Sequence, residues 1–230
     1  SQTYTDPELA KAIENIWNSR GEEGFEISDF QDPINEVIRR LESGTIRVAE
    51  PCGKVSWKIN HWLKLGIFLY MELNQLSVIP ETLDPSGWFH ASASRFKEYG
   101  REDFTDGRYV VPGGIVRPGT YLGAGSRLKV CLVNIGAYIG DNTRIANGTK
   151  VGMGAQIGSN VTISQSVHIV DALGVFRTQP QRHFPVIIKD NCYIGPTCVL
   201  GPGVMMEQGG VLGNGVTLDG NTYIEDLVSG

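Results

Sequence analysis

Long apolar runs are missing from this 230-residue sequence, and positive charge is not in excess. The longest apolar stretch, around Leu65 to Met71, is far shorter than the roughly 20 residues that a membrane-spanning helix needs. Lys and Arg together number 20 against 25 Asp and Glu, so the formal net charge is −5. This balance argues against a protein that mainly grips nucleic-acid phosphates. We therefore expect neither a membrane nor a nucleic acid as a partner.

Cysteine is scarce as well, with four residues and no Cys-x-x-Cys pair: Cys52, Cys131, Cys192 and Cys198. This count provides neither a disulfide framework nor a zinc-type ligand set. The first seven residues are polar and acidic, unlike the start of a secretory signal peptide. We expect a cytoplasmic protein that holds no metal.

Glycine, by contrast, is abundant and unevenly placed. Of the 29 glycines, 8 lie in residues 1–109 and 21 in residues 110–230, while all four tryptophans lie in the first part. Within that part, Asp6-Pro7 and Asp32-Pro33 are typical helix starts, with the aspartate as the expected cap. We therefore predict a mainly α-helical N-terminal domain over residues 1–109 and a second, different architecture over residues 110–230.

The second part is a hexapeptide repeat. An aliphatic residue recurs at every sixth position, and a small residue follows four places later. The aliphatic column is Val133, Ile139, Ile145, Val151, Ile157, Ile163 and Ile169, then Ile188, Ile194, Leu200, Met206, Leu212 and Leu218, with an offset set at Val110, Val116, Leu122 and Leu128. This period is typical of a parallel β-helix with three short strands per turn. The predicted fold class is α+β, a small helical domain followed by a β-helix.

One large insertion interrupts the repeat at about residues 175–187. Because a coil of the β-helix closes tightly, we expect this segment to leave the prism as an extruded loop. Loops on rigid scaffolds often carry binding residues.

The sequence resembles the tetrahydrodipicolinate N-succinyltransferase family of hexapeptide-repeat acyltransferases from about Gly44 to Asp226. The matching segments are residues 41–50, 61–64, 108–112, 116–119, 133–138, 151–152, 155–158 and 188–195. The resemblance implies left-handed coiling and a homotrimer with active sites between neighbouring prisms. It also implies a CoA thioester, succinyl-CoA or acetyl-CoA, as the acyl donor and a small amino dicarboxylic acid as the acceptor.

Two positions depart from the family pattern at its proposed catalytic carboxylates. The family has an acidic residue where this chain has Ala146, and a glutamate where it has Val199. The segments on both sides are kept, and the inserted loop is longer than in the family. We therefore expect an N-acyltransferase with a shifted acceptor.

The loss of both carboxylates leaves the role of base to other residues. His168 and His183 are the candidate bases, because histidine accepts a proton near neutral pH. Arg117 is the candidate for a substrate carboxylate, since guanidinium pairs with carboxylate through two hydrogen bonds. Asn147 and Ser164 are weaker candidates for polar contacts with the substrate.

The expected donor site lies beside the inserted loop. Backbone groups of adjacent coils, as at Gly195, are expected to hydrogen-bond the pantetheine amides. The CoA phosphates are expected to meet a cationic group, with three candidates: Arg177, Arg182 and Lys189.

Two alternatives stay open. A metal-dependent hexapeptide enzyme needs three histidines that converge between coils, and only His168 lies on the regular repeat. The other alternative is a trimer that has lost its acid–base pair and only binds a ligand or partner.

Overall fold

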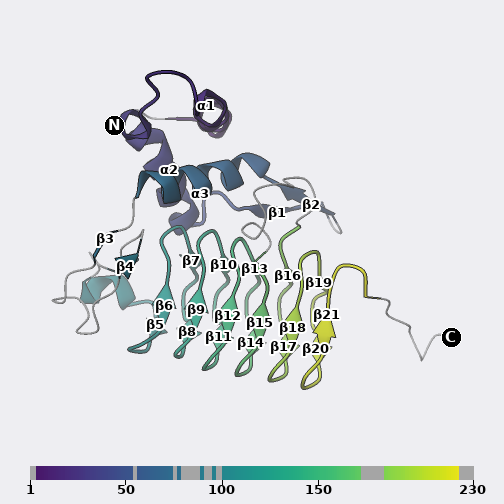
Figure 1. Cartoon of the computed structure of the whole chain (residues 1–230). Helices are drawn as coiled ribbons and strands as arrows, with labels where there is room; N and C mark the ends of the chain where they lie inside the picture. Colours follow the sequence, from purple (N-terminus) through teal and green to yellow (C-terminus); the bar gives the residue numbers. More distant parts are fainter. Residues whose placement is uncertain are drawn as a thin grey trace.

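The computed structural model describes residues 4–53, 56–74, 77–78, 89–90, 95–96, 100–171 and 184–222. It has two parts, a group of helices and a long prism of short strands (Figure 1). In the ranges just given, no helix is long and apolar enough to cross a membrane.

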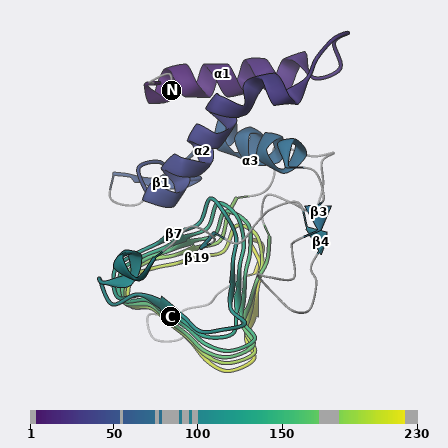
Figure 2. The same cartoon turned by 90° about the vertical axis from the view of Figure 1, so that its left-hand side faces the viewer.

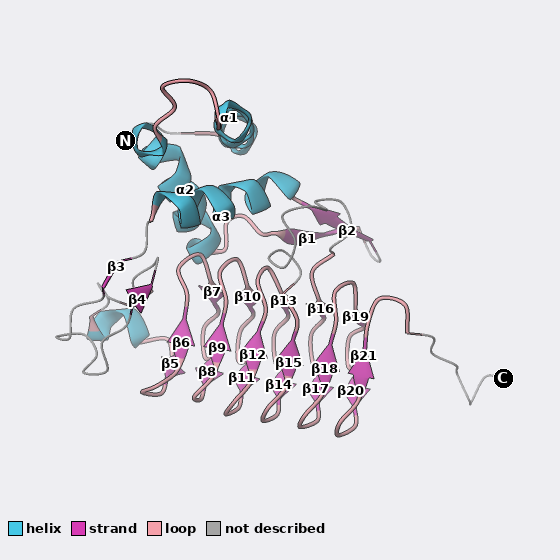
Figure 3. Ribbon diagram, in the orientation of Figure 1, coloured by secondary structure: helices cyan, strands magenta, loops and turns pink. Residues whose placement is uncertain are grey.

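The N-terminal part contains three α-helices, α1 (Asp6–Ser19), α2 (Gln31–Ser43) and α3 (His61–Leu73). Shorter elements lie between and after them: η1 (Ile27–Phe30), β1 (Ala49–Cys52), β2 (Ser56–Ile59), β3 (Ser77–Val78), β4 (Phe89–His90) and η2 (Arg101–Phe104). The pairs β1–β2 and β3–β4 are antiparallel. The distribution of helix and strand along the chain is shown in Figure 3.

The helix starts differ from the sequence prediction by one or two residues. Thr5, not Asp6, is the N-cap of α1, and its backbone N–H donates to the Glu8 carboxylate at 2.7 Å in a capping box. Asp32 lies in the first turn of α2 rather than at its cap, which is Phe30. Both aspartates still lie at the positive end of their helix, where a carboxylate is favourable.

The second part is a parallel β-helix built from three sheets that run along one prism. The β7 face contains β7 (Tyr121–Leu122), β10 (Tyr138–Ile139), β13 (Gln156–Ile157), β16 (Ile187–Ile188) and β19 (Met205–Met206). The β8 face contains β5 (Tyr109–Val110), β8 (Arg127–Leu128), β11 (Arg144–Ile145), β14 (Thr162–Ile163), β17 (Tyr193–Ile194) and β20 (Val211–Leu212). The β9 face contains β6 (Ile115–Val116), β9 (Leu132–Val133), β12 (Lys150–Val151), β15 (His168–Ile169), β18 (Val199–Leu200) and β21 (Thr217–Leu218).

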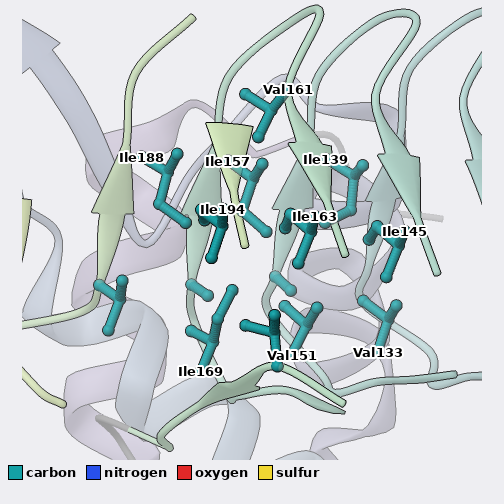
Figure 4. Close-up of a cluster of buried hydrophobic side chains, with 14 of the residues drawn as sticks. Val133, Ile139, Ile145, Val151, Ile157, Val161, Ile163, Ile169, Ile188 and Ile194 are labelled. Atoms are coloured by element: carbon teal, nitrogen blue, oxygen red, sulfur yellow. The ribbon is translucent and has the colours of Figure 1, made fainter. Parts of the chain in front are cut away.

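Each strand has two residues, of which the second points into the prism. The inward residues are the predicted aliphatic column, and ten side chains of this core are labelled in Figure 4. The described residues of the corner column are also buried from Ala137 to Val204, as at Thr143 and Thr149, which are 0% exposed. The predicted α+β fold class is therefore confirmed, and the parallel solenoid is consistent with left-handed coiling.

The insertion enters between two neighbouring coils. Arg144 pairs with Thr162 and Lys150 with His168, both 18 residues apart, whereas Gln156 pairs with Ile187, 31 residues away. Residues 172–183 of this segment lie outside the described residues. Val186 and Ile187 are buried and Ile187 belongs to β16, so the predicted bound of the loop at residue 187 is too far along the chain.

The helices cover one side of the prism, the β7 face (Figure 2). Ile135 and Met153 of the β-helix share a buried cluster with apolar residues of α1, α2 and α3. The Arg47 guanidinium lies 3.6 Å from the Tyr138 ring centroid, and its Nε donates to Gln156 Oε1 at 2.9 Å. The β8 and β9 faces are the two sides left for other contacts. The domain boundary near residue 109, where β5 begins, stays a prediction.

Candidate functional site

His168 lies on the β9 face as the outward residue of β15. It is exposed, and its neighbours on the adjacent coils are Lys150 of β12 and Val199 of β18. Adjacent strands are about 4.8 Å apart, so the imidazole stands directly beside the position that replaces the family's glutamate. A base placed here is accessible to a substrate that binds on the β9 face.

Arg117 lies on the same face, at the corner that follows β6. Its Nη1 donates to Asn134 Oδ1 at 3.1 Å, and Asn134 Nδ2 donates to Asp171 Oδ1 at 3.1 Å. Burial lowers the pKa of the Arg117 guanidinium, while the negative charge of Asp171 partly offsets this effect. The backbone N–H of Met153 also donates to Asp171, so the carboxylate is fixed from two sides.

This chain of polar contacts depends on a glycine between two of its members. Asn134 and Asp171 come from different coils, and Gly152 lies on the coil between them. A Cβ on Gly152 would come within 2.6 Å of the Asp171 backbone nitrogen and the Val170 carbonyl carbon. Only glycine allows the coils to approach in this way.

Ser164 and Asn147 belong to the β8 side. Ser164 Oγ lies 3.2 Å from Tyr193 Oη, and the two hydroxyls form an exposed hydrogen bond. Asn147 Oδ1 accepts a hydrogen bond of 3.2 Å from the backbone N–H of Val130, so the Asn147 side chain links two neighbouring coils at the corner. The Ser164 hydroxyl is thus accessible to solvent, whereas the side-chain oxygen of Asn147 already accepts a hydrogen bond.

Ala146 and Val199, the two altered family positions, lie on different sides of the prism. Ala146 follows β11 of the β8 face, whereas Val199 is the outward residue of β18 on the β9 face. Outward side chains of two faces of one prism point away from each other. The candidate residues therefore divide between two faces, each called a half-site below: Ser164 on the β8 face, and Arg117 and His168 on the β9 face. Arg117 follows β6 and His168 lies on β15, three strands and about 14 Å further along that face.

Two of the candidate donor contacts have other partners in the structure. Lys189 Nζ is 2.6 Å from Glu207 Oε2, so its charge is already balanced. The space beside Gly195 is filled by the next coil, since a Cβ there would lie 2.7 Å from Asn214 Oδ1. Arg177, Arg182 and His183 lie outside the described residues. A role of these five residues in binding or catalysis stays a prediction.

Sequence reasoning did not single out Lys150, Asn134 or Asp171 as parts of the half-site on the β9 face. Lys150 could have been found by counting 18 residues back from His168. Asn134 and Asp171 are 37 residues apart, one more than two 18-residue coils, so the repeat places them near each other without showing that their side chains meet. Across the described ranges, no group of three His, Cys, Asp or Glu side chains is arranged to hold a metal ion.

Sequence comparisons match this chain to known proteins over most of its length. Residues 8–73 match the family model described as "Tetrahydrodipicolinate N-succinyltransferase N-terminal". The 2,3,4,5-tetrahydropyridine-2,6-dicarboxylate N-succinyltransferase of Methylorubrum extorquens is 34% identical over 226 residues, which cover 97% of this chain and 78% of the relative. The enzyme of the same name from Polynucleobacter asymbioticus is 35% identical over 228 residues, covering 95% and 78%.

The similarity of this chain to a solved structure is weaker than its similarity to these sequences. A perosamine N-acetyltransferase variant from Caulobacter crescentus, in complex with CoA and GDP-perosamine, is 17% identical. The overlap covers 49% of this chain and 53% of the other at a TM-score of 0.26, which is too low to carry any inference.

Proposed function

The chain belongs to the tetrahydrodipicolinate N-succinyltransferase family, and from this premise we propose that it transfers a succinyl or acetyl group from a CoA thioester to the amine of a small amino acid. The observation that carries the proposal is 33–35% identity to N-succinyltransferases over most of the chain. We further propose that the acceptor is not tetrahydrodipicolinate. The reason is that Ala146 and Val199 replace the two carboxylates that the family resemblance implies for catalysis.

In this proposal His168 acts as the base. The free amine attacks the thioester carbonyl carbon, the carbon–sulfur bond breaks, and the amine proton passes to the imidazole. His168 then returns the proton to the departing thiolate, which leaves as the thiol of CoA. Its place beside Val199 supports this role, since the imidazole takes over the neighbourhood of the missing glutamate.

The two half-sites support a shared active site. We propose that the β8 face of one copy meets the β9 face of another in a homotrimer, which brings Ser164 of one copy toward His168 of the next. Positioning of a bound amine against a bound thioester then supplies much of the rate acceleration. A cytoplasmic location accompanies this proposal as a prediction.

The donor is expected to lie between neighbouring prisms near the inserted segment. The thioester supplies the activated acyl carbon, and this chain contributes the groups that hold it. Among the described candidates, Lys189 fits the CoA phosphates only if it exchanges its contact with Glu207, which is 71% exposed and therefore free to move. Arg177 and Arg182 are the remaining candidates.

A thiol-release assay tests the proposal. The full chain is mixed with succinyl-CoA or acetyl-CoA and a panel of amino acids that includes tetrahydrodipicolinate, and free CoA is followed with a thiol reagent. We expect turnover with an amino acid other than tetrahydrodipicolinate. Turnover of tetrahydrodipicolinate at the rate of an ordinary family member would contradict the shifted acceptor.

The loss of both carboxylates also supports a second candidate function, a trimer that binds a ligand without catalysis. CoA binding by calorimetry without thiol release on any acceptor would favour this candidate over the enzyme.

A further inference from the structure

Three cationic side chains lie close together on the β8 face and are called the basic cluster: Arg127, Lys129 and Arg144. All three side chains are exposed. Among the residues that the structure describes, none of them forms a hydrogen bond or an ion pair, and the one aromatic contact is Arg127 at 6.0 Å from the Tyr109 ring centroid. Their charge is available to a ligand.

The β-helix places these side chains close together. Arg127 and Arg144 are register partners on adjacent strands, which lie about 4.8 Å apart. Lys129 follows two residues after Arg127, and the alternation of side chains turns it to the same outward side. Its backbone N–H donates to Ile145 O at 2.9 Å, so Lys129 lies next to Ala146.

No acidic side chain balances the cluster within the described part of the β8 face. Asp106, just before β5, pairs with Arg108 at 3.1 Å. The other described acidic residues of the β-helix follow strands of the other two faces: Asp141, Asp190 and Glu207 after the β7 face, Asp171 and Asp219 after the β9 face. Asp141 and Asp190 accept hydrogen bonds from the backbone N–H groups of Ala124 and Ser159, at 2.9 and 2.7 Å. Glu207 pairs with Lys189.

Like charges on register partners repel each other, so the arrangement does not serve stability. Lys189 on the β7 face, by contrast, pairs with Glu207 on the next coil. The chain as a whole carries a net charge of −5, so three cations gathered on two adjacent coils are a local concentration of positive charge. Such a concentration is typical of an anion-binding surface.

The cluster borders the half-site on the β8 face. Ala146 follows Ile145, whose carbonyl accepts the Lys129 backbone N–H, and on the next coil Thr162 and Ser164 add hydroxyl groups, since Thr162 is the register partner of Arg144. Resting on the proposed acyl transfer, we propose that the shifted acceptor carries a phosphate group besides its amine, and that Arg127, Lys129 and Arg144 bind this phosphate.

The chemistry of the cluster favours phosphate over carboxylate. A phosphate monoester concentrates about −1.5 to −2 charges on three oxygens, whereas a carboxylate carries one charge on two. Three permanent cations on two adjacent coils match the more compact and more highly charged group. Arginine offers two parallel hydrogen bonds to a phosphate, and lysine adds a point charge.

Calorimetric titration of the full chain with inorganic pyrophosphate tests the site. We expect saturable binding that Arg144→Gln or Lys129→Gln weakens at least tenfold. Lys11→Gln, which removes the same charge from an exposed position of α1, is the matched control and should leave the affinity unchanged. Circular dichroism of each variant checks that the fold is kept.

Two further titrations separate the sources of the anion. CoA and adenosine 3′,5′-bisphosphate should not displace pyrophosphate, and succinate should bind at least tenfold more weakly. Displacement by CoA would assign the cluster to the phosphates of the donor and overturn the proposal. Equal affinity for succinate, equal weakening by Lys11→Gln, or no binding by the wild type would overturn it as well.

The acyl-transfer assay distinguishes a failure of the phosphate assignment from a failure of the proposed acyl transfer. Pyrophosphate should inhibit thiol release in competition with the acceptor, and Arg144→Gln should raise the acceptor KM more than it lowers kcat. If pyrophosphate binds but no acceptor of any class supports thiol release, the anion site stands and the assignment to an acceptor falls. If turnover occurs but pyrophosphate neither binds nor inhibits, the enzyme stands and the phosphate assignment falls.

Discussion

His168 differs from the other described candidates in that its side chain has no hydrogen-bond partner in the described ranges. Arg117 is joined to Asn134, Asn147 accepts a backbone N–H, and Ser164 bonds to Tyr193. A side chain without a partner, exposed beside Val199, is free to meet a substrate.

His168→Gln should lower kcat by about 10² to 10⁴, because this is the usual contribution of a general base. The loss should fall on kcat and leave the acceptor KM little changed, which a merely structural role would not cause. His61→Gln, at an exposed histidine that begins α3, should keep the wild-type kcat and KM. A fully active His168→Gln variant would remove His168 as the base.

Gly152→Ala should destabilise the protein by about 1–3 kcal/mol, because the new methyl group would meet the backbone of Val170 and Asp171 at 2.6 Å. Gly213→Ala is the control, since nothing lies within 4 Å of its Cβ position. Urea unfolding of both variants at one protein concentration measures the difference. Equal stabilities would show that the coils can separate at Gly152 without cost.

At the scale of elements, α2 is the helix whose electrostatics the structure defines best. The Glu36 carboxylate accepts hydrogen bonds from Arg39 and Arg40 at 2.6–2.7 Å, and Arg40 also pairs with Asp6 at the start of α1. These contacts, the Arg39 hydrogen bond first, lower the pKa of Glu36 below its usual value of 4.5. The ionised Glu36 thus holds the Arg40 side chain, which also pairs with Asp6 of α1.

Glu36→Gln should cost about 1 kcal/mol at pH 7, an amount typical of a partly exposed ion pair. A carboxylate whose pKa is lower in the folded than in the unfolded state stabilises the protein fully at a pH above its unfolded-state pKa. This stabilisation is lost as the pH falls through the folded-state pKa. The stability difference between variant and wild type should therefore narrow from about pH 5 downward. Glu14→Gln, at an exposed position of α1, provides the control for a general charge effect. A difference that is constant between pH 7 and pH 4 would contradict this role of Glu36.

At the scale of the whole molecule, the uncovered faces of the prism expose apolar side chains. Tyr109, Tyr193 and Val211 of the β8 face are 39%, 42% and 70% exposed, and Ile115 of the β9 face is 45% exposed. Exposed apolar surface beside polar half-sites is typical of a protein interface. The β8 and β9 faces are available for such an interface, because the helices cover the β7 face.

Light scattering should give a mass of about three times 25.1 kDa, as expected for a homotrimer. Val211→Asp, which places a charge on the most exposed of these apolar side chains, should weaken the trimer and lower acyl transfer in parallel. Thr217→Asp, on the neighbouring β9-face strand of the same terminal coils, tests whether the β9 face takes part as well. A stable, active monomer would exclude active sites shared between copies.

The sequence by itself determined the core of the prism. Every residue of the predicted aliphatic column that the structure describes points inward, because a six-residue period fixes the direction of a side chain through local geometry alone. The helices were also predictable in outline, although Thr5 and Phe30 rather than two aspartates begin them.

The tertiary structure alone decided which residues meet on the outside of the prism. Asn134 and Asp171 are separated by two 18-residue coils and one further residue, and their side chains meet because Gly152 lies on the coil between them. The position of the helices on the β7 face likewise follows from contacts such as that of Arg47 with Tyr138. The side-chain partners in these contacts are distant in sequence, so they are set by packing in three dimensions, which no local pattern of residues contains.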